Sequence, residues 1–379
     1  MAARELWSGL VFRDVVALHT LMAGSRTRRR TAVALACALA GCSAPERHAS
    51  PPPGPTASAP AGPRLYVTNE RSGDLSVVDV TSRRRIATLR LGKRPRGARL
   101  APDRSVLYVA LSGSPFAPPG VDEKTLPPPD RSADGIGVVD LQALRLVRVI
   151  PVGTDPEQLA VSPDGRRLFV ANEDAATVSV VDVASGRVLA ALPVGGEPEG
   201  VEATPDGAVV YATSEEDSEV FAIDAQGMKL LGRFAVPARP RGIAFLPDGS
   251  RAYVTCENGH AVAVVDARSR AVLGTIPFEG ENARPMGIVA SRDGRRVYVT
   301  TGRGGAVVAI DTGSGRPAAQ VEVGARPWGI ALSADGRTLY TANGPSNDIS
   351  IVDVARFAVT GRVGVGDGPW GVAVAEPAP

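Results

Sequence analysis

The sequence predicts an all-β protein, a seven-bladed β-propeller of four-stranded blades, and three repeated positions carry that prediction. The aromatic position recurs at intervals of 42, 61, 42, 42, 45 and 42 residues. Its copies are Tyr66, Tyr108, Phe169, Tyr211, Tyr253, Tyr298 and Tyr340. The second position is occupied by Asp79, Asp140, Asp182, Asp224, Asp266, Asp311 and Asp353. The third is occupied by Pro95, Pro156, Pro198, Pro240, Pro285, Pro327 and Pro369.

Each repeat contains four expected strands. One strand follows the proline, one runs through the aromatic residue, one ends at the aspartate and one leads to the next proline. Apolar residues alternate within these strands, as Ile349, Ile351 and Val354 do around Ser350. Four strands in roughly 42 residues is the size of a propeller blade, whereas a two-sheet sandwich of so many strands is implausible.

The ends of the repeat region predict how the ring closes. The region opens with the strand through Tyr66, which has no proline strand before it, and it ends at residues 370–375 with a proline strand that has no aromatic strand after it. We therefore expect the last strand to become the innermost strand of the first blade. This pairing would join both ends of the region in one sheet.

Composition excludes several other classes of protein. Gly and Pro together account for 42 + 32 = 74 of the 379 residues, and aromatic residues for 4%. No apolar run reaches the roughly 18 residues of a transmembrane helix. A collagen, a disordered tail and a multispan membrane protein are therefore excluded.

The net charge argues against nucleic acid as a partner. The chain has a formal charge of +2, but residues 1–41 contain six Arg and two acidic residues. Without that segment, 36 basic residues face 38 acidic ones. A net charge near −2 lacks the concentrated positive surface that phosphate binding needs.

The N-terminus has the pattern of a bacterial lipoprotein signal. Arg26 and Arg28–Arg30 precede a short apolar stretch, and residues 39–42 read Leu, Ala, Gly, Cys. This sequence resembles a lipobox, which implies that Cys42 is diacylated and begins the mature chain. We expect a signal segment at 1–41, in which Met22 is an alternative start, a lipidated tether at 42–63 and a propeller at 64–379. The alternative is a short buried helix.

Ser43 resembles the sorting residue of outer-membrane lipoproteins. We therefore expect a lipid-anchored protein that faces the periplasm, at the outer membrane in a diderm cell.

The repeats also resemble a known family. Tyr66, Val67, Thr68 and Asn69 spell the signature of the YVTN β-propeller family, and related elements recur across residues 65–375. The chain looks closest to the β-propeller protein associated with PQQ-dependent alcohol catabolism. The segments that carry this second resemblance are 94–97, 172–174, 196–200, 239–242 and 328–329. The resemblance implies an accessory role in periplasmic PQQ-dependent alcohol oxidation.

Residues repeated in every blade are predicted to be structural. We expect the seven aspartates to accept hydrogen bonds from the N–H groups of turns at strand ends. A glycine two residues after the proline suits close backbone approach near the axis, with Gln158 as the one exception. Its copies are Gly97, Gly200, Gly242, Gly287, Gly329 and Gly371.

Function is expected where the blades differ, on the face that carries the proline loops. That face holds a proline-rich insertion at about 112–131 and a smaller one near 278–283, and it gathers charged residues and tryptophans around the axis. The candidate binding residues are Arg94, Arg96, Glu157, Glu199, Arg239, Arg241, Arg284, Arg326, Trp328 and Trp370. They predict a concave site for an anionic or aromatic small molecule, or for the loop of an envelope protein. The alternative is a ring of ion pairs that neutralise one another beneath packed tryptophans, and the insertion could equally be a tolerated surface loop.

Known propeller chemistries find little support in the sequence. Beyond residue 63 the only histidine is His260 and the only cysteine is Cys256, so haem d1 ligation and a disulfide are not expected. We therefore expect no cofactor, no metal site and no catalytic residue, and a monomer that binds a ligand or an envelope protein without catalysis. The alternative is a metal-dependent hydrolase or lactonase with its site at the mouth of the propeller.

Overall fold

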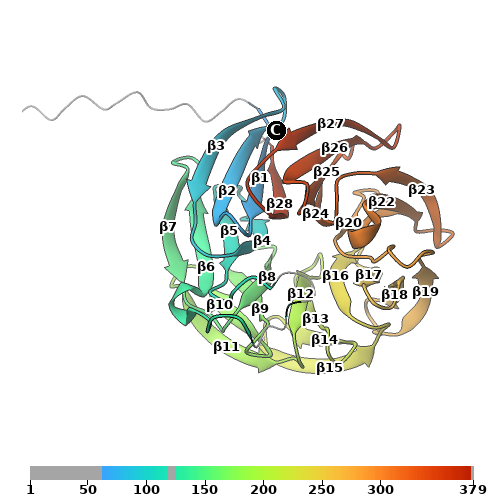
Figure 1. Cartoon of the computed structure of the whole chain (residues 1–379). Coiled ribbons are helices and arrows are strands. Elements are labelled where there is room, and N and C mark those ends of the chain that lie inside the picture. Colours follow the sequence, from blue (N-terminus) through green and yellow to red (C-terminus); the bar gives the residue numbers. More distant parts are fainter. Residues whose placement is uncertain (1–61, 118–120, 122–124, 377–379) are drawn as a thin grey trace, which may run out of the picture. The chain divides into compact units, whose positions relative to one another are not determined.

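A computed structural model describes residues 62–117, 121 and 125–376. The expected signal segment, the lipobox with Cys42 and nearly all of the tether lie outside the described residues. The described chain forms seven four-stranded antiparallel sheets around a central axis (Figure 1). This arrangement confirms the seven-bladed β-propeller.

The strands are given blade by blade, from the axis outward. Blade 1 contains β28 (Pro369–Ala375), β1 (Arg64–Asn69), β2 (Asp74–Asp79) and β3 (Arg84–Arg90). Blade 2 contains β4 (Pro95–Leu100), β5 (Val106–Leu111), β6 (Gly135–Asp140) and β7 (Arg145–Ile150). Blade 3 contains β8 (Pro156–Val161), β9 (Arg167–Asn172), β10 (Thr177–Asp182) and β11 (Arg187–Pro193). Blade 4 contains β12 (Pro198–Ala203), β13 (Val209–Ser214), β14 (Glu219–Asp224) and β15 (Lys229–Ala235).

The remaining blades follow the same order. Blade 5 contains β16 (Pro240–Phe245), β17 (Arg251–Cys256), β18 (Ala261–Asp266) and β19 (Val272–Pro277). Blade 6 contains β20 (Ile288–Ala290), β21 (Arg296–Thr300), β22 (Ala306–Asp311) and β23 (Arg316–Glu322). Blade 7 contains β24 (Pro327–Leu332), β25 (Thr338–Asn343), β26 (Asp348–Asp353) and β27 (Ala358–Gly364). Two short 3-10 turns, η2 (Arg131–Ala133) and η3 (Gly302–Gly304), interrupt loops of blades 2 and 6. In the described residues no helix is long and apolar enough to cross a membrane.

Strand β28 closes the ring. It pairs antiparallel with β1, and its register places Ala375 opposite Arg64 and Val374 opposite Leu65. The C-terminal strand is therefore the innermost strand of the first blade, as predicted, and Figure 1 shows the two ends of the repeat region in that sheet.

The core lies between neighbouring blades. Phe169 and Val178 of blade 3 pack in one cluster with Val210 and Phe221 of blade 4. All seven copies of the repeated aromatic residue are buried, and burying a side chain of this size stabilises the fold by about 1.5–3 kcal/mol. The period-2 alternation of the strands thus places one apolar face against each neighbouring sheet.

A repeated threonine links the inner ends of adjacent blades. In blade 4 the hydroxyl of Thr213 accepts a hydrogen bond from the Gly200 N–H at 2.7 Å and donates to the Arg241 carbonyl of blade 5 at 3.2 Å. The same pattern recurs at Thr68, Thr255 and Thr300. A Cβ at Gly200 would collide with the Arg241 carbonyl, so the close approach predicted for the glycine position is confirmed.

The repeated aspartates are structural, as predicted. Asp79 accepts a hydrogen bond from the Ser82 N–H at 2.7 Å, and Asp182 accepts one from Ser185 in the same way. The hydrogen bond from the Ser82 hydroxyl lowers the pKa of Asp79. These carboxylates therefore accept hydrogen bonds from backbone N–H groups of the turns that follow the third strand of each blade.

Candidate functional site at the proline-loop face

The proline-loop face opens into a cavity of about 610 Å³, here called the mouth. Eight of the ten candidate binding residues line it; Glu199 lines a smaller axial cavity, and Arg284 lines neither. The eight are Arg94, Arg96, Glu157, Arg239, Arg241, Arg326, Trp328 and Trp370.

The proline loops share an unusual backbone conformation. The residue before the repeated proline has a left-handed φ of 35–59° in five blades. Those residues are Arg94, Asp155, Glu197, Arg239 and Arg326. Residues other than glycine adopt this region rarely, and such strain often gathers at functional loops. Arg284, before the proline of blade 6, does not share the left-handed φ, because its loop is three residues longer and leads to the shortened strand β20.

Arg96 is buried among three carboxylates. Its guanidinium contacts Asp155, lies 3.2 Å from the Glu157 carboxylate and 3.1 Å from the Glu173 carboxylate, and its side chain is 3% exposed. Burial acts to raise the pKa of Asp155, but the Arg96 guanidinium and the Ser112 hydroxyl outweigh it and hold the pKa below its ordinary value. Burial and the charge of Glu157 raise the pKa of Glu173 well above its ordinary value.

Arg241 occupies a second buried cluster. It contacts Glu199, and its guanidinium lies 2.5 Å from Glu215 and 2.8 Å from Glu257. Arg239 adds contacts of 2.6 Å to Glu215 and 3.4 Å to Glu257. Burial raises the pKa of Glu215 to about 9, although the charge of Arg239 opposes this shift. Arg96, Glu157, Glu199 and Arg241 are therefore paired inside the protein, as the ion-pair interpretation expected, whereas the paired Arg239 is 42% exposed.

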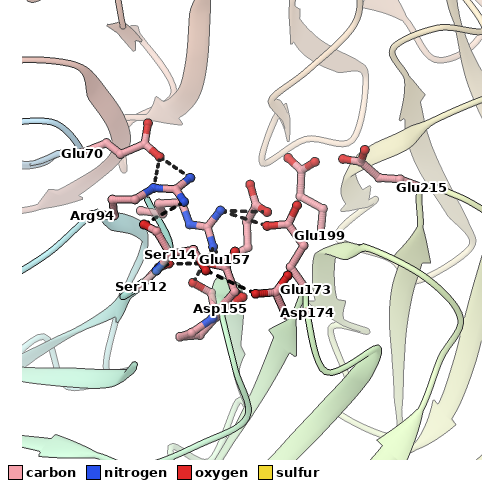
Figure 2. Close-up of polar contacts among 12 residues, drawn as sticks. Glu70, Arg94, Ser112, Ser114, Asp155, Glu157, Glu173, Asp174, Glu199 and Glu215 are labelled. Atoms are coloured by element: carbon pink, nitrogen blue, oxygen red, sulfur yellow. Dashed lines mark hydrogen bonds and ion pairs between the residues drawn. The ribbon is translucent and has the colours of Figure 1, made fainter. Parts of the chain in front are cut away.

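The residues missed by the sequence analysis are Glu70, Glu173, Glu215 and Glu257. Each follows the second strand of its blade directly, at one repeated position. A backbone hydrogen bond from each Glu N–H reaches the residue before the proline of the same blade, as from Glu257 to the Arg239 carbonyl at 2.9 Å. Glu70 then pairs with Arg94 at 2.8 Å, and Figure 2 shows this pair beside the carboxyl groups of Glu157, Glu173 and Glu199. The sequence did contain a signal for these residues. A glutamate recurs directly after the second strand of the blade, as Glu70 does after residues 66–69.

Arg326 has a different environment. Its guanidinium carbon lies 5.0 Å from the centroid of the Trp328 ring, and in the described chain no carboxylate lies within ion-pair distance of it. Burial lowers the pKa of Arg326, and the charge of Glu257 opposes this shift. The Trp328 and Trp370 rings stack with centroids 5.7 Å apart and planes at 29°. Arg326 and the tryptophan pair thus give the mouth one cationic and aromatic wall.

The insertion supplies an apolar part of the lining. Phe116, Leu126 and residues 127–129 line the mouth. Arg94 donates hydrogen bonds to the carbonyls of Ser114 and Pro115, both at 3.2 Å. At the far end of the insertion Lys93 pairs with Asp130 at 2.7 Å and Arg131 pairs with Asp174. The described parts of the insertion are therefore tied to the blades, as an ordered arm would be; residues 118–120 and 122–124 lie outside the description.

The described chain contains one cysteine and one histidine, and both lie in blade 5. Burial raises the pKa of the Cys256 thiol to about 12. The Nδ1 atom of His260 lies 3.3 Å from the Ala283 carbonyl. Among the described residues no group of three or more His, Cys, Asp and Glu side chains is arranged to hold a metal ion.

Two family models match parts of the chain. The model of the seven-bladed β-propeller lactonases matches residues 47–192, and that of the choice-of-anchor I domain matches residues 135–283. Each match covers less than half of the chain. No curated protein sequence matches it.

Solved structures share the fold at low sequence identity. A chain of Kuenenia stuttgartiensis hydrazine synthase is 20% identical, with a TM-score of 0.63, over 75% of this chain and 96% of that one. A "putative 6-phosphogluconolactonase" from Bacteroides uniformis is 18% identical, with a TM-score of 0.67, over 83% of this chain and 100% of that one. The dihydro-heme d1 dehydrogenase NirN is 17% identical, with a TM-score of 0.56, over 83% of this chain and 64% of that one. At such identities the likeness shows a propeller and no particular activity.

Proposed function

We propose that this chain is a non-catalytic binding module of the cell envelope, which holds a planar anionic ligand, or an acidic loop of an envelope protein, in the mouth. The observation that carries the proposal is Arg326, a partly buried guanidinium beside stacked tryptophans in a cavity of about 610 Å³. A guanidinium without a protein carboxylate suits a charge-assisted hydrogen bond to an anion. The half-buried Trp328 adds aromatic surface for a planar group, and Phe116 and Leu126 of the insertion line the same cavity.

The environment of the protein is part of this proposal. The lipobox-like sequence at Cys42 would anchor the chain by lipid in the envelope, facing the periplasm. The resemblance to propellers associated with PQQ-dependent alcohol catabolism places aromatic carboxylates among the ligands to try. An accessory role in that oxidation is the physiological setting we infer.

Intrinsic fluorescence provides the test. The only tryptophans of the sequence are Trp7, Trp328 and Trp370, so the chain from residue 43 onward reports on the mouth alone. Benzoate, pyrroloquinoline quinone and glucose 6-phosphate are titrated against it. We expect saturable quenching by an aromatic carboxylate, and at least a tenfold higher Kd in Arg326→Ala.

The matched control is Arg284→Ala, since Arg284 occupies the same repeat position but does not line the mouth. It should bind as the wild type does. Equal affinities of wild type and Arg326→Ala for every titrated anion would overturn the assignment of the mouth as an anion site.

A second candidate function is a lactonase. The lactonase family model over residues 47–192 and the Bacteroides neighbour favour it, and the Glu157 and Glu173 carboxyl groups in the mouth could serve as acid and base. The assay is hydrolysis of a phosphorylated sugar lactone with and without EDTA. Turnover abolished by Glu173→Gln would replace the binding proposal with this one, whereas binding without turnover supports the binding module.

A further inference from the structure

The outer strand of each blade contains a β-bulge at one repeated position. In blade 1 the pairing of β3 with β2 skips Ile86, which has no partner in the neighbouring strand. A bulge disrupts the hydrogen-bonding edge of a sheet and re-aims the extra side chain. The bulged residues of blades 1 to 7 are, in order, Ile86, Val147, Leu189, Leu231, Leu273, Ala318 and Thr360.

In blades 1 to 5 the bulged residue is a large aliphatic side chain that stays exposed. The exposed fraction of these five residues is 39–58%, whereas blades 6 and 7 have the smaller Ala318 and Thr360. A bulge that only protects an edge from pairing is better served by a charged side chain. One exposed aliphatic residue is ordinary, so the charge of the rim and the path of the chain decide where an apolar contact is made.

The charge of the rim is positive at blades 1 and 2, which are adjacent in the ring (Figure 1). Residues 74–90 and 135–150, the two outer strands of these blades with their connecting turns, contain six arginines and three aspartates. The equivalent residues of blades 3 and 4, 177–193 and 219–235, contain three basic and three acidic residues. Neither β3 nor β7 contains an acidic residue. The exposed arginines of these two strands are Arg84, Arg85, Arg90, Arg145 and Arg148.

Most of these arginines lack partners within the described chain. Arg148 donates a hydrogen bond to the Val183 carbonyl of blade 3 at 2.8 Å. The aspartates of the same segments accept hydrogen bonds from turn N–H groups or, at Asp74, from the Asn69 amide. Four arginine side chains form no hydrogen bond or ion pair with a described residue, namely Arg84, Arg85, Arg90 and Arg145. The rim of blades 1 and 2 therefore presents uncompensated positive charge beside exposed aliphatic side chains.

The described chain begins beside this rim. The Pro63 carbonyl accepts a hydrogen bond from the Val80 N–H at 3.1 Å, and a Cβ at Gly62 would lie 3.5 Å from the Thr81 Oγ1 atom. Val80 and Thr81 belong to the turn that leads into β3. The expected lipidated tether therefore joins the propeller at the start of β3.

We propose that the rim formed by β3 and β7 docks on the surface of an anionic phospholipid membrane. The proposal rests on the lipid anchor of the proposed function, which brings this rim to the bilayer. The guanidinium groups pair with lipid phosphates, and Ile86, Val147 and Val149 enter the boundary between headgroups and acyl chains. A flat bilayer can touch only adjacent blades of a ring, so the docked propeller stands on its edge. Its axis then lies parallel to the membrane, and the mouth opens sideways to soluble ligands.

Vesicle sedimentation of the unlipidated chain from residue 43 onward tests the rim without the anchor. The vesicles contain phosphatidylcholine alone or phosphatidylcholine with phosphatidylglycerol. We expect binding to the anionic vesicles at low ionic strength and little binding at physiological ionic strength, because salt screens the charges. Absence of binding to the anionic vesicles at low ionic strength, or equal binding to both kinds of vesicle, would overturn the proposal.

Two double variants separate the apolar from the charged part of the rim. Threonine should preserve the fold at a bulge, because Thr360 occupies that position in blade 7. Ile86→Thr with Val147→Thr should lower the vesicle partition coefficient at least tenfold. Arg84→Gln with Arg85→Gln should do the same.

The matched control is Leu231→Thr with Leu273→Thr, at the bulges of blades 4 and 5. It should bind vesicles as the wild type does. Equal losses in the control pair and in Ile86→Thr with Val147→Thr would show that blades 1 and 2 make no special contact and would overturn the docking rim.

A fluorophore attached to Ile86→Cys gives a second readout, since Cys256 is buried. Its emission should shift to the blue with anionic vesicles, whereas emission from a fluorophore on Leu273→Cys should not. The opposite pattern would place the membrane at the wrong side of the ring.

Failure of this proposal can be distinguished from failure of the proposed function, because the vesicle assay uses neither the lipid anchor nor a ligand of the mouth. Arg326→Ala should lose anion binding in the mouth while it binds vesicles as the wild type does. Arg84→Gln with Arg85→Gln should show the reverse.

Discussion

The guanidinium of Arg241 lies over the ring of Trp328, with 5.4 Å between its Cζ atom and the ring centroid. The same guanidinium contacts Glu199, Glu215 and Glu257, and its side chain is 7% exposed. One wall of the mouth thus rests on a buried ion-pair cluster. Arg241 supports Trp328 from below, whereas Arg326 approaches the ring without a carboxylate partner of its own within ion-pair distance in the described chain.

Removal of Arg241 should therefore destabilise the fold. Arg241→Ala leaves three buried carboxylates without their main counter-charge, and breaking a buried ion pair in this way costs about 3–5 kcal/mol. Arg326→Ala, at a partly exposed site, should change the free energy of unfolding by about 0.5 kcal/mol or less. Urea unfolding measures both. If Arg241→Ala is as stable as Arg326→Ala, the cluster contributes little to the fold. Burial acts to raise the pKa of Glu257, but Arg241 holds it below its ordinary value, so recovery of stability in the double variant with Glu257→Gln would confirm the electrostatic cause.

The sequence alone predicts the blades because each carries the same three positions, and it predicts closure because the first and last repeats are complementary. It also selects the proline-loop face for the candidate site, since the blades differ there, and the structure shows a cavity of about 610 Å³ on that face. The sequence does not separate Arg241 from Arg326, because the difference depends on Glu215 and Glu257. Backbone hydrogen bonds to the proline loops of blades 4 and 5 hold these two residues beside Arg241. Arg284 has the same neighbours in sequence as the others, and only the longer loop of blade 6 turns it away from the cavity.

Stability should decrease as the pH rises from 5 to 9, in part through Glu215. Its pKa of about 9 in the folded protein is higher than the roughly 4.3 of a glutamate in an unfolded chain. The proton held by the folded state therefore stabilises it fully below about pH 4.3, and this contribution is lost as the pH rises toward 9. The loss is at most about 1.4 kcal/mol for each pH unit within that window.

Thermal unfolding from pH 5 to pH 9 measures this effect. Glu215→Gln cannot ionise, so its Tm should fall less steeply with pH, and the slope that remains should come from Glu173, whose pKa is also raised. Parallel curves for wild type and Glu215→Gln would show that Glu215 is ionised throughout this range.

Truncation before β28 should abolish ring closure. The strand Pro369–Ala375 pairs with β1 and covers the inner edge of blade 1, so its loss exposes two sheet edges. We expect a loss of several kcal/mol, on the scale of the apolar area uncovered. The control is a chain that ends after Glu376, which keeps every hydrogen bond of the strand. An equal urea midpoint for both truncated chains would contradict the role of β28.

Membrane association should depend on Cys42. Two or three acyl chains contribute about 0.8 kcal/mol for each buried CH₂ group, which makes release from the membrane negligible. In cells of a lipoprotein-processing bacterium the wild type should sediment with membranes, and Cys42→Ala should remain in the soluble fraction. Equal partitioning of the two proteins would refute lipid anchoring at this residue.

Shortening the insertion should weaken binding in the mouth without unfolding the propeller. The two ends of the arm already meet, because the Asp130 N–H donates to the Gly113 carbonyl at 2.9 Å. Residues 114–129 can therefore be replaced by a short glycine linker with little strain on β5 and β6. The deletion removes Phe116, Leu126 and the three prolines that line the mouth together with Trp328 and Trp370, so a planar anion that binds the wild type should lose at least tenfold in affinity. Phe116→Ala, within an intact arm, should lose less than the deletion. An unchanged Kd in the deletion variant, with a normal Tm, would show that the arm is a tolerated surface insertion and that ligands of the mouth rest on the tryptophan wall alone.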